Sequence, residues 1–427
     1  MARAPPPAPR RPRAVPDTRP PLYLYDDAAA RAFEPFASTR PAGELRAGAE
    51  LVRRRWERAL GARAAGFLSA PHLDGFTEFD APAAVARTAV LPSGAWLVNA
   101  RFAPRLTAAA ADARALVCDG RVAAVRLPAP LAAPRLADGA LAFEAVLDPG
   151  HAGTAAVEGW WMDAVWDYVG RLQPMLAGDV PALGADCEVI EHGAVVLGPH
   201  PVYVEAGANV EPYVVFDAAA GPVLVRRGAT VHAFTRVAGP CFVGEGSTVA
   251  GDKVSGCSIG EVSRVHGEIS ASIVLGHANK AHDGFVGHSY LGRWANLGAG
   301  TTTSNLKNTY GTVALWTPEG VRDTGLQFLG SLLGDHAKTG IGLRLTTGSV
   351  VGAGANVYDG MPPKFTPPFA WGGGAPYDAY DAERFVRVAA RAMRRRGVAL
   401  DAGMERVLRA AHARAASWRD AAPGDRA

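Results

Sequence analysis

The stretch Val225-Arg-Arg-Gly-Ala-Thr-Val231-His-Ala-Phe-Thr-Arg-Val237-Ala-Gly-Pro-Cys-Phe-Val243-Gly-Glu-Gly-Ser-Thr-Val249 places a valine at every sixth position. A period of six fits neither the alternation of an amphipathic strand nor the 3.6-residue period of a helix. It indicates a parallel β-helix of hexapeptide repeats, in which three hexapeptides form one turn of about 18 residues. We therefore predict a solenoid whose valines point into its interior.

The same phase continues to Val357, and 15 of its 23 positions are Val, Ile, Leu or Phe, with Ile273 and Phe285 among them. An earlier six-residue series covers residues 190–214. A β-sandwich would not keep this phase over so long a stretch. Glycines beside many of these aliphatics suit bends that need a positive φ or a close approach. We expect the β-helix over residues 185–362.

Before the solenoid the chain mixes strand and helix signals. Leu22–Tyr25 is a short β-type run, and Glu44–Leu60 carries apolar residues on one helical face. Asp119-Gly120 joins two further apolar runs and is a strong hairpin signal. This mixture predicts an α/β domain over residues 22–180.

The two ends of the chain have their own character. Residues 1–21 hold five arginines among prolines and alanines, without the apolar run of a signal peptide, and are expected to be a disordered arm. Residues 363–427 form a tail in which we predict two helices, at about 378–396 and 401–418.

Composition excludes several classes of function. The 427 residues, 48% hydrophobic and 20% charged, describe a globular chain of two or three domains. A net charge of +3 with both signs interspersed gives no reason to expect a nucleic-acid partner. No stretch approaches the ~18 apolar residues of a membrane-spanning helix, so no membrane association is expected. The four cysteines form no C-x-x-C pair, which favours reduced thiols and the cytoplasm.

Lysine and asparagine gather in one part of the chain. Only five of the 44 basic residues are lysines, and all five lie between Lys253 and Lys364, with five of the seven asparagines. The densest polar runs there are Asn279-Lys-Ala-His-Asp-Gly-Phe-Val-Gly-His288 and Trp294-Ala-Asn-Leu-Gly-Ala-Gly-Thr-Thr-Thr-Ser-Asn-Leu-Lys-Asn308. We expect the chemistry of the protein in this region.

These two runs resemble the acetyltransferase half of the bifunctional enzyme that makes UDP-N-acetylglucosamine. Its motifs read K-A-G-H, N-I-G-A-G-T and C-N-Y. Aligned without a gap, the catalytic histidine of that family falls on His282, its sugar-contacting asparagine on Asn296 and its second asparagine on Asn305.

Further motifs resemble a family of sugar nucleotidyltransferases that is similar to this bifunctional enzyme. They lie at Asn279–Gly287, Asn296–Thr301, Ser304–Asn308, Asp323–Gln327, Gly334–Gly340 and Phe369–Gly373, with opening motifs at Thr39–Pro41 and Glu44–Gly48. The resemblance covers most of residues 22–410. It implies a nucleotidyltransferase-like α/β domain, a left-handed β-helix that assembles as a homotrimer, and a role in sugar-nucleotide biosynthesis.

Acetyl transfer to an amino sugar needs a base for the amine proton, a positive clamp for phosphate and donors for the thioester oxyanion. His282 suits the base because imidazole titrates near the operating pH, although a structural rung of the solenoid could also be a histidine. Asn305 would act beside it. The predicted sugar-phosphate contacts are Lys280, Asn296, Lys307, Arg40 and Arg46. The resemblance implies that acetyl-coenzyme A lies near Asp335, His336, Lys338 and Ala353.

The chain departs from these families at several positions. The tyrosine three residues after the catalytic histidine is Phe285 here. The glycine-rich triphosphate loop, G-x-G-T-R-M, is replaced by Asp26-Asp27-Ala-Ala-Ala-Arg31, and a magnesium-binding aspartate by Asn99. Nucleotidyl transfer, and the Mg²⁺ that it uses, are therefore expected only because the family resemblance implies them and not from motifs of this chain.

Two other classes of function fit parts of the pattern. His277 and His282 are five residues apart, a spacing that hexapeptide carbonic anhydrases use for two zinc ligands, but Cys241 stands where a third is needed. We accordingly predict no resident metal. A non-catalytic scaffold that binds a sugar nucleotide would be stabilised by its ligand without turnover.

Overall fold

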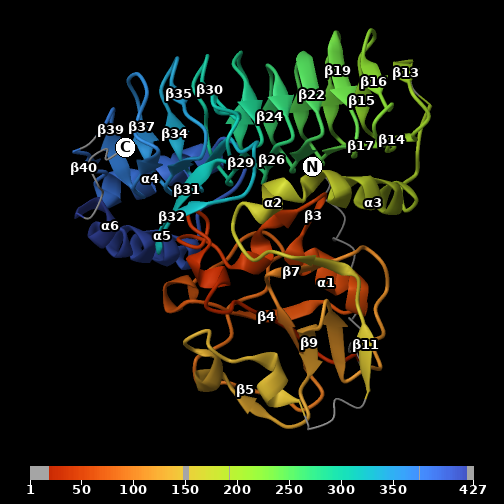
Figure 1. Ribbon diagram of the computed structural model, residues 1–427, viewed down its shortest axis with the longest axis vertical. Helices are drawn as coiled ribbons and strands as arrows, with labels where there is room; N and C mark the ends of the chain where they lie inside the picture. The colour runs from red at the N-terminus through yellow and green to blue at the C-terminus, as the bar shows by residue number, and fades with distance from the viewer. Residues whose placement is uncertain (1–18, 148–152, 192, 375, 421–427) are drawn as a thin grey trace, which may run out of the picture.

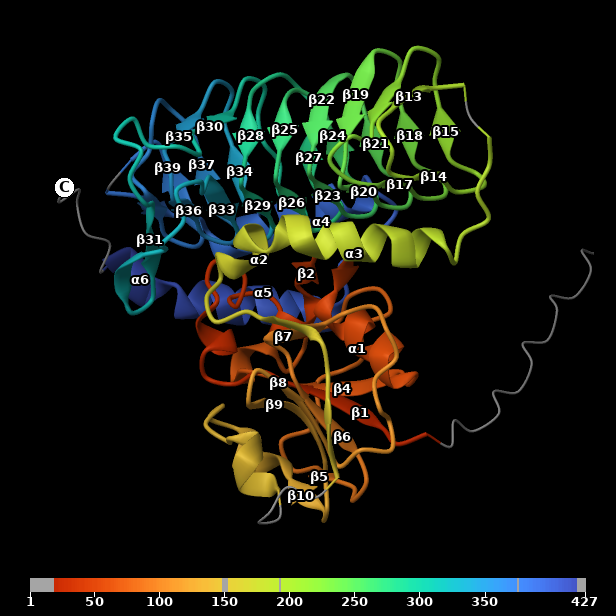
Figure 2. The ribbon, with the colours of Figure 1, turned by 45° about the vertical axis from the view of Figure 1, so that its right-hand side comes forward.

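The computed structural model describes residues 19–147, 153–191, 193–374 and 376–420. Almost all of the expected N-terminal arm lies outside these residues. A solenoid forms one side of the molecule and an α/β domain the other, with helices between them (Figures 1 and 2).

The N-terminal domain contains a six-stranded sheet in the order β11 (Thr154–Ala156), β8 (Ala115–Cys118), β9 (Arg121–Arg126), β6 (Trp96–Asn99), β1 (Leu22–Tyr25) and β4 (Ala64–Leu68). Strand β1 pairs in parallel with both β4 and β6. The predicted hairpin joins β8 to β9, and Asp119 and Gly120 have φ of 52° and 73°. Positive φ at both central residues is what a type I′ turn requires.

The helix expected over Glu44–Leu60 is shorter than predicted. A small hairpin of β2 (Arg46–Ala47) and β3 (Glu50–Leu51) precedes α1 (Val52–Leu60). Gly48 in this hairpin has a φ of +62°, and a Cβ there would lie 2.1 Å from the Oδ2 atom of Asp179. The left-handed backbone at Gly48 therefore prevents the helix from starting earlier.

The predicted hexapeptide-repeat, left-handed β-helix is confirmed as a parallel β-solenoid of about 10 turns. Its six-stranded face consists of β13 (Val195–Leu197), β16 (Val215–Asp217), β19 (Thr235–Ala238), β22 (Asp252–Ser255), β25 (Ile269–Ser270) and β28 (Val286–Gly287). Its five-stranded face consists of β15 (Asn209–Val210), β18 (Thr230–Val231), β21 (Thr248–Val249), β24 (Arg264–Val265) and β27 (Asn279–Lys280).

The third side, here called the covered face, has nine strands. They are β14 (Val202–Val204), β17 (Val223–Val225), β20 (Cys241–Val243), β23 (Ser258–Ile259), β26 (Ile273–Val274), β29 (Tyr290–Leu291), β33 (Ser331–Leu333), β36 (Ser349–Val351) and β38 (Phe365–Thr366). Four strands continue the five-stranded side toward the C-terminus: β34 (Lys338–Thr339), β37 (Asn356–Val357), β39 (Ala370–Gly372) and β40 (Asp378–Ala379). A loop hairpin of β31 (Ala314–Thr317) and β32 (Gly320–Asp323) and a short pair of β30 (Thr302–Thr303) and β35 (Arg344–Leu345) complete the solenoid.

The predicted spacing of six residues between inward-facing positions is wrong in the middle of the solenoid. Val249 pairs with Val265 and Val265 with Lys280, so these turns contain 16 and 15 residues instead of 18. The predicted phase therefore puts Ile273 in the lumen, but it packs outside, on the covered face. Phe285 is only partly buried. Shorter bends shift the register, and the phase is regained at Leu291.

The covered face is apolar on both sides, as strands buried between two layers are expected to be. Its inward residues line the lumen, while the outward ones join the core of the N-terminal domain; the latter include Leu224, Phe242, Ile273, Tyr290, Leu332 and Val350. Helices α2 (Asp167–Gly170) and α3 (Leu172–Gly184) run along this face (Figure 2). The two domains thus share one hydrophobic core.

Both predicted C-terminal helices are confirmed, as α4 (Ala382–Arg394) and α5 (Ala402–Arg414), followed by α6 (Ala416–Asp420). Asp381 and Asp401 cap them, each accepting a backbone N–H three residues on. The helices pack on Phe76 of the N-terminal domain and Phe369 of the solenoid. Among the described residues, none of the helices is both long and apolar enough to cross a bilayer.

Candidate functional site

His282 lies in the bend between β27 and β28, and its side chain is exposed. Lys280 precedes it in an interior position, paired with Val265, and is only 2% exposed. Its Nζ donates to the carbonyl oxygens of Asp283 (3.0 Å), His266 (3.2 Å) and His282. Burial lowers the pKa of Lys280 to about 8. The predicted phosphate contact of Lys280 is therefore replaced by an internal support for the bend that carries His282.

Asn305 lies at the other end of β28. Its Nδ2 atom is 2.8 Å from Nδ1 of His288, and the ring of Phe328 stacks on His288 at 5.2 Å. Burial lowers the pKa of His288, which favours a neutral imidazole. From the sequence alone, His288 is assigned no role. This residue has a φ of 45°, but because it is not a glycine, the sequence held no sign that the chain turns a corner here.

One chain does not bring His282 and Asn305 together. The bend with His282 precedes β28 and the His288–Asn305 pair follows it, so the two lie beyond opposite ends of this strand. Lys307 is half-buried near the Asn305 end, and its Nζ donates to the carbonyl of Thr312 at 3.0 Å.

The six-stranded face carries a groove of about 470 Å³. Arg236 and Lys253 line it from adjacent strands, with Ala238 and Ser255 as part of its floor. Arg236 is ion-paired with Asp217 at 2.6 Å, whereas Lys253 is exposed. Two cations over small side chains suit a ligand that carries phosphate.

Asn296 and Lys338 lie on a different side of the solenoid from Asn305. Asn296 forms isolated bridges to Asn279 and Lys338, and its Oδ1 accepts from Nδ2 of Asn279 at 3.0 Å. Burial lowers the pKa of Lys338 to about 8, and its Nζ donates to the carbonyl of His336 at 3.3 Å. These two predicted contacts are brought together with each other, and Asn296 stacks on Asn279, three residues before His282.

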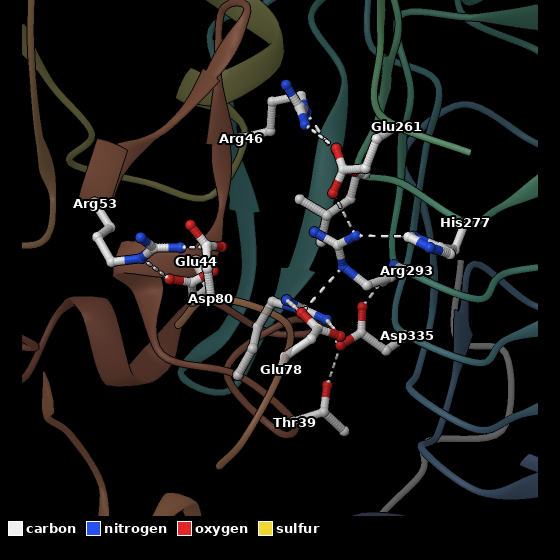
Figure 3. A network of polar contacts seen from close by, with 12 residues as sticks. Thr39, Glu44, Arg46, Arg53, Glu78, Asp80, Glu261, His277, Arg293 and Asp335 are labelled. Carbon is white, nitrogen blue, oxygen red and sulfur yellow. Dashed lines mark hydrogen bonds and ion pairs between the residues drawn. The ribbon is translucent and has the colours of Figure 1, made fainter. Parts of the chain in front are cut away.

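The remaining predicted contacts belong to a buried network between the domains (Figure 3). Arg40 donates from Nε to Asp335 at 2.7 Å and from Nη1 to Glu78 at 2.8 Å. Arg46 forms an ion pair with Glu261 at 2.6 Å. Guanidiniums this deeply buried are tolerated only when carboxylates accompany them, so both arginines are committed to the domain interface rather than to a phosphate.

The predicted coenzyme contacts lie at the same interface. Asp335 accepts from Thr39 at 2.8 Å and from the backbone N–H of Arg293 at 2.7 Å. His336 is 2% exposed, and burial holds its pKa well below the usual value. Ala353 is fully buried, against Gly334. In one chain, these three residues have no exposed surface to offer a coenzyme.

Arginine 293 is the centre of the network, and sequence reasoning missed it. Its guanidinium contacts Glu261 (2.6 Å), Glu78 (3.0 Å) and Nδ1 of His277 (3.1 Å). Burial and the adjacent Arg293 cation together lower the pKa of His277 to about 4, so the imidazole is neutral at pH 7. The same cation, with Arg46, holds the pKa of Glu261 well below its usual range despite burial.

The carboxyl ends of β1, β4 and β6 are where an open α/β sheet holds its ligand. There, Asp27 accepts from Nη2 of Arg101 at 2.7 Å and from Asn99 at 3.0 Å, and Arg101 also reaches Asp163 at 2.9 Å. Asp26 is buried, which raises its pKa to about 6. A guanidinium thus fills the space between the carboxylates, and this donor set does not fit a magnesium ion.

Among the described residues, one group of three could hold a metal ion: Asp252, His266 and Asp283. It contains neither His277 nor His282. His277 is instead packed between Phe79 and Trp294, at 4.7 and 4.5 Å between ring centres. This packing disfavours the zinc interpretation of the five-residue spacing.

Comparison with known proteins relates the N-terminal domain to one family. Residues 22–188 match the sugar nucleotidyl transferase family. No curated protein matches the chain. A hexapeptide transferase family protein from Anaplasma phagocytophilum is 11% identical, with 52% of this chain and 97% of that chain covered and a TM-score of 0.23. The β-helix assignment rests on the strand ladders and not on that likeness.

Proposed function

We propose that the protein transfers an acyl group from acetyl-coenzyme A to an amino-sugar phosphate, with His282 as the base. The observation that carries the proposal is the bend of His282, where an exposed imidazole is supported from inside the solenoid by three hydrogen bonds from Lys280. Such a bend presents a reactive group in a fixed position. The groove on the six-stranded face, two turns away from β28, suits one phosphate group, because Asp217 neutralises Arg236 and leaves the charge of Lys253.

In the proposed reaction the amine nitrogen of the sugar attacks the thioester carbon. His282 accepts the amine proton, the C–N bond forms, and the C–S bond breaks as the proton passes to the departing thiolate. The Asn305 side-chain amide donates to the oxyanion. Because His282 and Asn305 lie at opposite ends of β28, we place the reacting centre between two copies of the chain in a homotrimer.

The expected activity is thiol release from acetyl-coenzyme A in the presence of glucosamine 1-phosphate. His282→Ala should lose at least about a hundredfold in rate, as removal of a general base does, without a change in melting temperature. His232→Ala is the matched control, because His232 is a solenoid histidine held by Glu211 away from the site. Equal rates for His282→Ala and the unaltered protein would remove His282 from the mechanism.

Subunit mixing tests the position of the site. If His282 of one copy works with Asn305 of the next, the inactive His282→Ala and Asn305→Ala proteins should regain activity when unfolded, mixed and refolded together. Random assembly of trimers would restore about a quarter of the sites. A mixture as inactive as its components, in particles of trimer mass, would contradict a shared site.

The family match favours a second candidate, sugar-1-phosphate nucleotidyl transfer by residues 22–188. The ion pairs of Arg101 with Asp27 and Asp163 argue against this activity, because the guanidinium fills the space between these carboxylates and leaves no fit for a magnesium ion. Incubation with UTP, a sugar 1-phosphate and MgCl₂ decides between them: pyrophosphate release supports transfer, and thermal stabilisation by UTP without release supports a binding scaffold.

A further inference from the structure

A cavity of about 620 Å³ opens between the two domains, away from the six-stranded face. Residues 44–80 of the N-terminal domain form one wall, and the solenoid bends from Arg227 to Arg293 form the other. Neither the family match nor the proposed acyl transfer gives this cavity a role. Its volume lies within the range of small-molecule sites in proteins.

Phe79 presents an aromatic surface to this cavity. It is 53% exposed and has a φ of 49°, a left-handed conformation that is costly for a bulky side chain. Its ring lies over the guanidinium of Arg293, at 4.9 Å, and stacks on His277 at 4.7 Å. Phe234 is also exposed with a positive φ, so what distinguishes Phe79 is its place in the wall of a cavity, against a buried network of ion pairs.

The residues on either side of Phe79 hold it in place. Glu78 is 7% exposed and pairs with Arg40 and Arg293. Asp80 pairs with Arg53 (3.1 Å) and Arg54 (3.3 Å). The aromatic surface is therefore fixed before any ligand arrives, which reduces the entropy lost on binding.

The charges of the cavity define the chemistry of its ligand. Five carboxylates and three guanidiniums line it. Each of these guanidiniums already pairs with a carboxylate, so a free anion would have to displace one, and an apolar molecule would desolvate charges without replacing their hydrogen bonds. A carboxylate can accept two hydrogen bonds side by side, and a guanidinium can donate two. Both arrangements match the adjacent hydroxyl groups of a ligand. An aromatic face attracts the polarised C–H groups of a sugar ring. We propose that the cavity binds a neutral pyranose, with its ring on Phe79.

Binding is measured by saturation-transfer NMR with glucose and N-acetylglucosamine as neutral probes on the full chain. At least one sugar should receive saturation on its ring protons, and Phe79→Gly should weaken it about tenfold because stacking and apolar contact are lost. Glycine accepts the positive φ, so this variant keeps the backbone. Phe234→Gly is the matched control, since Phe234 is 76% exposed with a φ of 64° on the far bends of the solenoid.

Three outcomes would overturn the proposal: no transfer to any of the sugars, transfer that Phe79→Gly leaves unchanged, or displacement of the sugar by inorganic phosphate at equal concentration. The inference is independent of the acyl transfer. His282→Ala should bind the sugar in this cavity normally, so failure at one site does not imply failure at the other.

Discussion

At the scale of single residues, burial keeps several histidines neutral. It lowers the pKa of His72 and of His277 to about 4 and holds that of His336 well below its usual value. An unfolded histidine takes up a proton near pH 6.5, whereas His72 and His277 do so only near pH 4. Because the unfolded state binds more protons in this window, the free energy of unfolding falls as the pH drops from 6.5 to 4.

We therefore expect urea unfolding at pH 5 to need markedly less denaturant than at pH 7.5, with His72 and His277 each contributing about 2 kcal/mol to the difference. Asp26 acts in the opposite sense, because its pKa is raised to about 6 in the folded state, which gains stability as the pH falls from 6 toward 4. Asp26→Asn should raise stability at pH 7.5 and steepen the acid loss. A pH-independent midpoint would show that the histidines are not held neutral.

At the scale of the element, close stacking of solenoid turns restricts certain strand positions to glycine. A Cβ on Gly260, just after β23, would lie 2.2 Å from the carbonyl oxygen of Leu275 in the next turn. Gly260 does not have a positive φ, so crowding alone excludes a side chain there. The short turns of 15 to 17 residues in this region leave no slack in the bend to move the strands apart.

Gly260→Ala should therefore lower the free energy of unfolding by about 2–3 kcal/mol or more, as overpacking against backbone does. Gly170→Ala in α2 is the control, because its Cβ would meet only Leu326 methyls, at 3.4 Å. Urea titrations of both variants measure the difference. Equal midpoints would mean that adjacent turns separate easily.

At the scale of the whole molecule, the N-terminal domain covers one side of the solenoid. The outward residues of the covered face lie in the core that the two domains share, and the ion pairs of Arg40 and Arg46 cross the same boundary. Separating the domains would expose apolar surface and leave Asp335 without its guanidinium partner Arg40.

A fragment of residues 185–427 should accordingly aggregate, which size-exclusion chromatography and light scattering would detect. Replacing Leu224, Phe242 and Leu332 together by serine should restore much of its solubility, because these side chains face the missing domain. A monodisperse fragment without these changes would show that the covered face does not depend on the N-terminal domain.

Local signals in the sequence were sufficient for the parts of the fold whose constraints are local. The valines at six-residue spacing predicted the solenoid, Asp119-Gly120 the hairpin, and helical periodicity α4 and α5. The register between Val249 and Leu291 was not predictable in this way, because turns of unequal length return to the same phase after 42 residues.

The roles of charged residues depended on the tertiary structure. Motifs drew attention to Arg40, Arg46 and Asp335 as ligand contacts, yet Arg40 and Asp335, 295 positions apart, neutralise each other at the domain interface. Lys280 likewise points inward because a shortened turn puts it in register with Val265. The sequence by itself determined that a solenoid forms. Which charges face a ligand was decided only by folding, because burial forces each charge to find its partner wherever the fold places one.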